Sequence, residues 1–334
     1  MHEIDSFRRA PVVVTGGAGY VGSVLVHRLL EQGQPVRVLD NFLFGDAPLA
    51  DLAGHPGLAT VRGDVREREA LDRAFAGAAA VVHLAGLVGD PLCAKDPELT
   101  RSINEHSSVP VAESARAAGV PHLVFASTCS VYGAAGDDWL DETSRTSPVS
   151  LYAQTNLISE EILASRLEGS GTALSVLRFA TIYGVSPRMR FDLVVNLLTA
   201  RARGEGRLEV HGGDQWRPQV HVADVAAAVV LVLERGPAVA GTLNVGSDAQ
   251  NYRIRDLAEA IAAAFPGTAL TVQDIRDPRS YRVSFERLRR LGFAPAHDLA
   301  SGVREIADYL ARAGVNADEA RFHNVRALNG HAPA

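Results

Sequence analysis

The sequence predicts an α/β protein with a Rossmann-type doubly wound parallel sheet and a smaller mixed α/β lobe. Three observations lead to this prediction. Short runs of Val, Leu and Ala alternate with helical stretches, a glycine-rich turn follows the first run, and an acidic residue ends the second. Such apolar runs are typical of strands buried on both faces of a parallel sheet. Right-handed crossovers between them give a doubly wound sheet.

The elements follow in a regular order up to about Arg178, where the alternation ends. We therefore expect a Rossmann domain over residues 1–178, with a returning segment at about 220–250. Residues 179–219 and 251–316 form the lobe, and 317–334 form a polar C-terminal tail. Strands are expected at 12–14, 36–39, 58–61, 80–84, 123–126, 174–177 and 243–245, and helices at 21–30, 67–75, 107–118, 151–167, 193–203 and 222–233.

Composition limits the function classes. The 334 residues are 47% hydrophobic and 22% charged, which is ordinary for a globular protein. The net charge of −6 and the lack of a basic stripe argue against a nucleic-acid partner. Two cysteines make neither a disulfide framework nor a zinc site, so we expect no metal. Without a signal-like segment or an apolar run of ~18 residues, a cytoplasmic protein without a membrane partner is expected.

The turn Thr15-Gly16-Gly17-Ala18-Gly19-Tyr20-Val21-Gly22 lies between the first strand and the first helix. There, Gly16 permits a tight turn, Gly19 lets a pyrophosphate approach the backbone amides, and Gly22 allows close packing of helix on strand. Asp40 ends the second strand about 20 residues later, where an acid binds the ribose hydroxyls of NAD and repels the extra phosphate of NADP. The sequence therefore predicts an NAD site.

Other residues at strand ends extend this candidate site. Asp64 follows the third strand and is suited either to the adenine amino group or to capping the next helix. Small residues after the fourth strand let the cofactor lie close to the backbone, although a packing constraint explains them equally well. The full set of expected cofactor-binding residues is Gly16, Gly19, Tyr20, Val21, Gly22, Asp40, Asn41, Asp64, Val65, Leu84, Ala85, Gly86, Tyr152 and Asn156.

Two further segments carry the chemistry. The fifth strand ends in Phe125-Ala126-Ser127-Thr128-Cys129-Ser130-Val131-Tyr132-Gly133, and a helix begins with Tyr152-Ala153-Gln154-Thr155-Asn156. With the glycine turn, these segments make the chain resemble the extended short-chain dehydrogenase/reductase superfamily, specifically its NAD-dependent nucleotide-sugar epimerases and dehydratases. The resemblance implies that Tyr152 exchanges a proton with a sugar hydroxyl while Thr128 hydrogen-bonds the same oxygen.

Position 156 departs from the family pattern, because it holds Asn where the family has Lys. A free phenol has a pKa of about 10, and a cation one helical turn away is the usual means of lowering it. Three interpretations remain open. The enzyme is slow or uses another base, it works at a step where a neutral Tyr152 acts as an acid, or it keeps the cofactor only for structure.

The residues after Thr128 bear on the reaction type. The resemblance implies Asp and Glu at these places in hexose 4,6-dehydratases, whereas this chain has Cys129 and Ser130. The missing carboxylates favour an epimerase over a dehydratase. Cys129 is expected to be a buried small residue instead of a nucleophile, and Tyr132 is expected to pack.

The lobe supplies the expected substrate ligands. The resemblance implies that Arg217 and Arg279 hold a nucleotide diphosphate, with Arg276 and Arg282 as rivals of Arg279, and a guanidinium suits this role because it binds phosphate bidentately. Thr181 stands where the family often has Asn, and Pro218 stands where an acid often follows the arginine. Val88 is expected to border the sugar. His221 and Asp224 are expected to serve packing and helix capping, while Asn196, Arg188 and Arg190 are further candidates.

We therefore expect an NAD-dependent epimerase that acts on a nucleoside-diphosphate sugar through a transient keto-sugar. Its catalytic residues are Tyr152, Thr128 and, at the usual Lys position, Asn156. The alternatives are an NAD(P)-dependent keto-sugar reductase or dehydratase, and a dinucleotide-sensing protein with impaired catalysis. By family analogy, a homodimer is expected through helices near 98–118 and 151–167.

Overall fold

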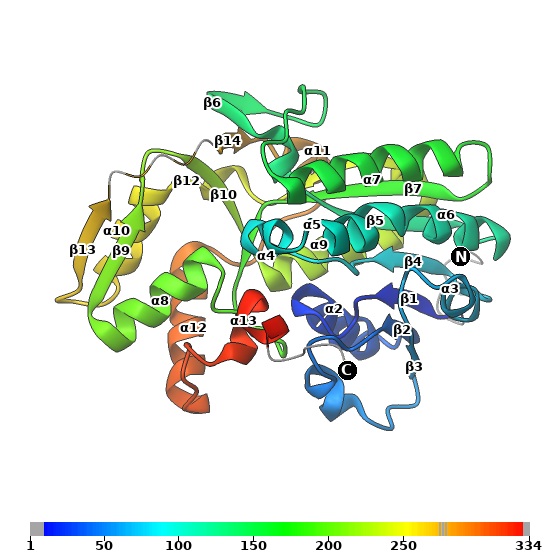
Figure 1. The fold of residues 1–334 in the computed structure, drawn as a ribbon, viewed down its shortest axis with the longest axis horizontal. Helices are drawn as coiled ribbons and strands as arrows, with labels where there is room; N and C mark the ends of the chain where they lie inside the picture. Colours follow the sequence, from blue (N-terminus) through cyan, green and yellow to red (C-terminus); the bar gives the residue numbers. More distant parts are fainter. Residues whose placement is uncertain (1–9, 274, 276, 278, 330–334) are drawn as a thin grey trace. The chain divides into compact units, whose positions relative to one another are not determined.

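The computed structural model (Figure 1) describes residues 10–273, 275, 277 and 279–329. These residues divide into two compact units. Unit 1 is made of the described residues of Met1–Thr128, together with Ser150–Arg178 and Ala226–Leu243. Unit 2 contains Cys129–Val149, Phe179–Val225 and the described residues from Asn244 onward. Each unit is therefore assembled from separate stretches of the chain.

A seven-stranded sheet forms the frame of unit 1, in the order β11-β7-β5-β4-β1-β2-β3. The neighbours from β3 through β5 pair in parallel, with Val12–Thr15 of β1 in register with both β2 and β4. The chain order reverses at β1, and such a switch point is where open α/β sheets bind ligands. The strands are β1 (Val12–Thr15), β2 (Val36–Asp40), β3 (Leu58–Arg62), β4 (Ala80–His83), β5 (His122–Thr128), β7 (Ala173–Phe179) and β11 (Gly241–Val245).

Helices pack on this sheet through apolar faces. One buried cluster joins Leu71 and Phe75 of α3, Val111 of α6 and Leu163 of α7 to the central strands. Burial of these side chains is the main favourable contribution to the stability of unit 1. The helices are α2 (Tyr20–Glu31), α3 (Arg68–Phe75), α4 (Asp90–Lys95), α5 (Pro97–Thr100), α6 (Ser108–Ala117), α7 (Leu151–Leu167) and α9 (Val222–Arg235), and Arg101–His106 between α5 and α6 is π-helical.

Unit 2 is built on smaller sheets and its own apolar core. The sheets have the orders β12-β10-β8, β13-β9 and β14-β6. Its core cluster includes Phe191, Leu257 and Ile306. The strands are β6 (Ala134–Leu140), β8 (Thr181–Tyr183), β9 (Arg207–His211), β10 (Trp216–His221), β12 (Asn251–Arg253), β13 (Ala269–Gln273) and β14 (Ser280–Val283); the helices are α8 (Val194–Glu205), α10 (Ile254–Ala263), α11 (Glu286–Arg290), α12 (Leu299–Ala313) and α13 (Asn324–Asn329).

The predicted parallel sheet and mixed α/β lobe are confirmed, and the ends of the expected elements differ from the observed ones by at most two residues. The segment expected to be a polar tail has more structure than its composition indicates. Phe322 is 6% exposed, stacks edge-on against Phe191 and accepts a backbone hydrogen bond from its amide. Phe322 thus joins the segment to the core of unit 2, and Asn324 adds hydrogen bonds to Arg188 and Asp192. Among the described residues, every helix is too short or too polar to span a membrane.

One buried histidine makes the stability of unit 1 sensitive to pH. His122 begins β5, and its Nε2 lies 2.9 Å from Ser175 Oγ, which donates to the carbonyl oxygen of Val239. His122 Nε2 therefore carries the proton, while Nδ1 has no partner among the described residues. Burial lowers the pKa of His122 from 6.5 to about 4, so the imidazole is neutral in the folded protein near neutral pH.

A His122→Gln substitution should reduce the acid sensitivity of unit 1. The histidine takes up a proton in the unfolded chain below about pH 6.5 but in the folded protein only near pH 4, so folding loses stability as the pH falls between these values. At pH 5 this loss is about 2 kcal/mol. Glutamine keeps the donor to Ser175 and does not titrate.

Urea unfolding at pH 7 and pH 5 measures this difference, with circular dichroism as the signal because both tryptophans, Trp139 and Trp216, lie in unit 2. The variant should lose about 2 kcal/mol less than the wild type between the two pH values. Equal losses would show that His122 does not titrate on unfolding as expected.

Candidate functional site

The glycine turn of unit 1 leaves no room for side chains at two positions. Gly16 has φ +69°, and a Cβ there would lie 2.8 Å from the backbone nitrogen of Ala85. A Cβ at Gly22 would lie 2.2 Å from the carbonyl oxygen of Gly16. Gly19 is the N-cap of α2, and no side chain of a described residue caps this helix. A helix N-terminus without a side-chain cap suits an anion. Tyr20 is buried and Val21 half-buried in the first turn of the helix.

Asp40 connects the end of β2 to this turn. One carboxylate oxygen accepts a hydrogen bond from the Ala18 amide at 2.9 Å, and the other accepts from the Phe42 amide at 2.7 Å. Burial raises the pKa of Asp40, and the two backbone donors oppose that shift. The carboxylate retains further lone pairs for ribose hydroxyl donors.

The end of β4 is held to the same turn through Thr15. The Thr15 hydroxyl lies 2.7 Å from His83 Nδ1 and accepts a hydrogen bond from the Ala85 amide, while the Leu84 amide donates to the Thr15 carbonyl. Burial lowers the pKa of His83 to about 4, so the imidazole is neutral near pH 7. This neutral contact fixes the backbone that faces Gly16.

Asp64 lies after β3 and is engaged by its neighbours. It accepts two hydrogen bonds from the guanidinium of Arg66 and one from Asn41 Nδ2 at 3.3 Å. Burial by itself raises the pKa of Asp64, but these donors lower it by more, so the pKa lies below its ordinary value. The alternative that Asp64 caps the next helix is wrong, because Glu67 is the N-cap of α3. Val65 is buried beside it.

Residues after β4 are held by a side chain that sequence reasoning missed. Asn104, in the π-helical segment, accepts from the Leu87 amide at 2.7 Å and donates to the Leu87 carbonyl at 2.8 Å. Its amide oxygen also lies 3.2 Å from the place where a Cβ on Gly86 would stand. Val88, which follows Leu87, is 36% exposed.

The expected catalytic pair lies in unit 1. Thr128 ends β5, and Tyr152 is in the first turn of α7, where Ser150 caps the helix by accepting from the Ala153 amide. Asn156 is buried, and its Nδ2 donates to the Tyr152 carbonyl at 2.8 Å. The amide of Asn156 is therefore bonded to its own helix and brings no positive charge toward the phenol.

The residues that follow Thr128 belong to unit 2. Cys129 is 1% exposed, as expected for a buried small residue, and Ser130 Oγ lies 3.1 Å from the hydroxyl of Tyr281. The hydroxyl of Tyr132 donates to Asn244 Oδ1 at 2.8 Å, so this buried ring serves the structure of unit 2. Neither position after Thr128 offers a carboxylate.

In unit 2, the two expected phosphate ligands share one carboxylate. Arg217 Nη2 donates to Asp277 Oδ2 at 3.0 Å, while Arg279 Nε and Nη2 donate to the two oxygens of Asp277 at 2.9 and 2.7 Å. Arg217 also donates to the carbonyls of Trp216 and Arg279. Asp277 thus supplies the acidic partner that Pro218 does not. Two guanidiniums facing one carboxylate leave a net positive charge.

The rival and further candidates lie elsewhere in unit 2. The guanidinium of Arg282 lies over the rings of Trp139 and Trp216, at 4.3 and 4.4 Å from their centroids. Arg276 lies outside the described residues. The remaining candidates are buried and bonded internally, with Arg188 on Asn324, Arg190 on Asp192, and Asn196 on the backbone of Gly184 and Arg190.

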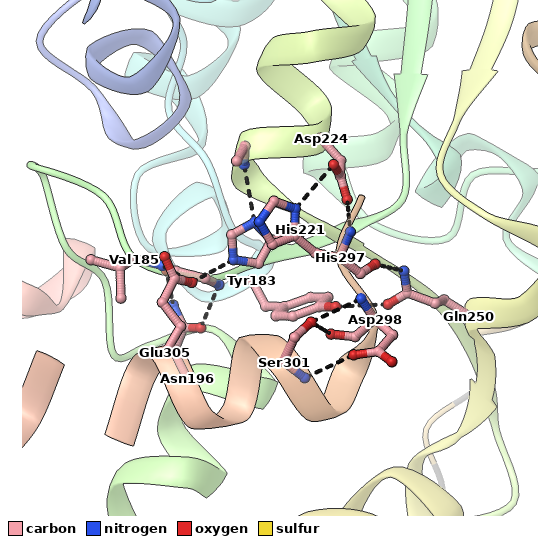
Figure 2. Close-up of polar contacts among 12 residues, drawn as sticks. Tyr183, Val185, Asn196, His221, Asp224, Gln250, His297, Asp298, Ser301 and Glu305 are labelled. Carbon is pink, nitrogen blue, oxygen red and sulfur yellow. Dashed lines mark hydrogen bonds and ion pairs between the residues drawn. The ribbon is translucent and has the colours of Figure 1, made fainter. Parts of the chain in front are cut away.

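A partly buried polar network supports the strands that carry Thr181 and Arg217. Figure 2 shows His221 Nε2 pointing to Glu305, at 2.6 Å, and His297 Nδ1 pointing to Asp224, at 3.1 Å. The two imidazole rings stack with centroids 4.0 Å apart. His221 Nδ1 accepts from the Ala223 amide, so His221 caps α9 as expected.

Asp224 instead binds the loop before α12, since it accepts hydrogen bonds from the amides of Ala296 and His297. Tyr183 completes the network by donating to Gln250 at 2.7 Å. Because β8 and β10 pair in parallel, with Thr181 in register with Gln219 and Tyr183 with His221, the network fixes both strands. Within the described part of the chain, no group of His, Cys, Asp and Glu side chains could hold a metal ion.

Comparison with known proteins agrees with this arrangement. The model of the NAD dependent epimerase/dehydratase family matches residues 12–246. The chain is 28% identical over 324 residues to a UDP-glucose 4-epimerase of Rhizobium leguminosarum bv. trifolii. This alignment covers 90% of this chain and 97% of the relative.

Two solved structures are also similar. The NAD complex of UDP-glucose 4-epimerase from Thermus thermophilus has a TM-score of 0.78 and 29% identity, and it covers 91% of this chain and 100% of that one. The dTDP-glucose 4,6-dehydratase DesIV of Streptomyces venezuelae, with NAD bound, has a TM-score of 0.81 and 26% identity. The match covers 91% of this chain and 98% of DesIV. With the glycine turn and the Thr128–Tyr152 pair, these matches show that the chain belongs to the NAD dependent epimerase/dehydratase family, a group of enzymes within the extended short-chain dehydrogenase/reductase superfamily.

Proposed function

We propose that the protein is an NAD-dependent epimerase that inverts one centre of a nucleoside-diphosphate sugar through a transient keto-sugar. The observation that carries the proposal is that unit 1 contains both the glycine turn and the Thr128–Tyr152 pair. UDP-glucose 4-epimerases among its relatives support UDP-sugars as the first substrates to test and C4 as the carbon altered.

The residues of unit 1 fit NAD. The side-chain-free turn at Gly16 and Gly22 and the uncapped start of α2 suit a pyrophosphate, and Asp40 suits the ribose hydroxyls. Around the same turn, Asn41, Asp64, Val65, Leu84, Ala85 and Gly86 are proposed to border the cofactor. Bound at these residues, NAD would supply the hydride acceptor and donor that the reaction at the sugar carbon requires.

The proposed roles of the chain's own groups follow from their chemistry. The phenolic oxygen of Tyr152 takes the proton of the sugar hydroxyl and gives it back, and Thr128 hydrogen-bonds the same oxygen. In unit 2, Arg217 and Arg279 bind the diphosphate through their guanidinium groups. Thr181 and Val88 are proposed as further contacts of the sugar nucleotide. Cys129 and Ser130 lack the carboxylates of a dehydratase, which supports epimerisation.

The test is to denature the purified protein and identify released small molecules by mass spectrometry. We expect NAD, and we then expect the native protein to interconvert UDP-glucose and UDP-galactose without net consumption of cofactor. Consumption of added reduced cofactor with a keto-sugar would support the reductase instead. Bound NAD without turnover of any nucleotide sugar would support a dinucleotide-sensing protein.

We further propose that the enzyme acts in the cytoplasm as a homodimer. The chain has two cysteines, Cys93 and Cys129, both of them buried, and so few cysteines favour a reducing compartment. The resemblance to the superfamily supports pairing through α6 and α7. Light scattering of the purified protein measures the mass, and a monomer of 35.5 kDa would rule out the dimer.

An Asn156→Lys substitution should shift the pH profile of turnover downward. An ammonium group one helical turn from Tyr152 stabilises the phenolate and lowers the pKa of the phenol. We expect the pH optimum of kcat to fall by about one unit, or kcat at pH 7 to rise about tenfold. Asn156→Met is the matched control, because its side chain is longer but uncharged. If neither quantity changes in the Lys variant, the charge is supplied elsewhere or is not needed.

An Arg217→Lys substitution should weaken substrate binding. Lysine keeps the charge but loses the fork that binds a diphosphate bidentately, so we expect KM to rise about tenfold with little change in kcat. Arg207→Lys, an exposed arginine of β9, is the control and should leave KM unchanged. Unchanged kinetics in Arg217→Lys would remove this residue from the substrate site.

A further inference from the structure

Glu160 lies at the centre of a buried contact that the proposed chemistry does not use. Its carboxylate accepts a hydrogen bond from the hydroxyl of Ser127, and it accepts from Arg178 Nε at 3.1 Å and Nη2 at 2.7 Å. All three residues are at most 7% exposed. They come from three elements, since Ser127 is on β5, Glu160 on α7 and Arg178 on β7.

The contact connects the two parts of the catalytic pair. Ser127 directly precedes Thr128 on β5, and Glu160 follows Tyr152 by eight residues, just over two turns of α7. One turn lies between Asn156 and Glu160. A regular helix and an extended strand are stiff over such lengths. A bond between Ser127 and Glu160 therefore sets how far the end of β5 stands from the first turn of α7.

A second contact strengthens the same part of the helix. The hydroxyl of Ser159 donates to the Asn104 carbonyl at 2.6 Å, which ties α7 to the π-helical segment. Asn156, in contrast, is bonded to its own helix and does not hold α7 to the sheet. Residues 159 and 160 thus each tie α7 to a neighbouring segment by hydrogen bonds.

Stability alone is a weak reason for burying this charge. Removing two charges from water is unfavourable, and apolar residues of similar volume often stabilise a core as well as an ion pair does. Apolar residues cannot reproduce the direction of three hydrogen bonds to one carboxylate. A directional contact next to a reactive pair serves to hold its geometry, because small displacements of reacting groups slow catalysis strongly.

We propose that Glu160 is a positioning residue that fixes Thr128 relative to Tyr152 through Ser127, with Arg178 orienting its carboxylate. This inference rests on the proposed function, since it assigns the pair its catalytic role. It predicts that loss of the Ser127 hydroxyl lowers kcat and leaves substrate and NAD binding unchanged.

The test uses Ser127→Ala, which removes one hydrogen bond and leaves the Glu160–Arg178 ion pair in place. We expect kcat to fall about tenfold, with KM and the amount of bound NAD unchanged. Ser127→Thr retains a hydroxyl and should restore most of the lost kcat. The matched control is Ser175→Ala, a buried hydroxyl at the opposite end of β7 that is bonded to His122 and Val239. It should lower the thermal midpoint to a similar extent and leave kcat unchanged.

The outcomes separate the two proposals. If the wild type is active and Ser127→Ala keeps full kcat, loses activity through KM, or behaves like Ser175→Ala, the positioning role is overturned and the epimerase function stands. If the wild type binds NAD but turns over no nucleotide sugar, the proposed function itself is overturned. The positioning role is then lost with it, since no catalytic pair remains to be positioned.

Discussion

The contact between α2 and the turn before it determines much of unit 1. Since a Cβ at Gly22 would lie 2.2 Å from the Gly16 carbonyl, the helix starts directly against the end of β1. That closeness brings Ala18 within hydrogen-bond distance of Asp40 and places Gly16 against Ala85. Three strand ends therefore meet at one helix N-terminus. A helix N-terminus at such a junction suits the pyrophosphate of the proposed dinucleotide.

Both units combine neutral polar contacts with ion pairs. In unit 1, Thr15 bonds His83, whose imidazole burial keeps uncharged, while Glu160 pairs with Arg178. In unit 2, Asp277 partners Arg217 and Glu305 partners His221. In the proposed division of labour, the glycine turn of unit 1 holds the pyrophosphate of a cofactor through backbone amides, and unit 2 recognises anionic phosphates through side chains.

The sequence predicts the features that depend on neighbours in the chain. Alternating apolar runs indicate the strands, and the glycine spacing indicates the turn at Gly16 because each glycine acts locally. Asp277, Asn104 and Glu160 were not predicted, since each has a partner far along the chain: Arg217, Leu87 and Ser127 lie 60, 17 and 33 residues away from them. The ordered segment around Phe322 escaped prediction for a related reason. One aromatic residue among polar neighbours does not indicate that its side chain packs into a core formed by distant residues.

The carboxylate at position 277 links two distant positions of the chain. With Pro218 after Arg217, the guanidinium depends on Asp277 for its acidic neighbour. An acid at 218 alone would give two carboxylates to two guanidiniums and so cancel the positive charge proposed to bind phosphate, and removing Asp277 alone would leave two cations facing each other. Changes at 218 and 277 are therefore tolerated best as a pair. A sequence comparison that examines position 218 without position 277 would misjudge whether the charge of Arg217 is balanced.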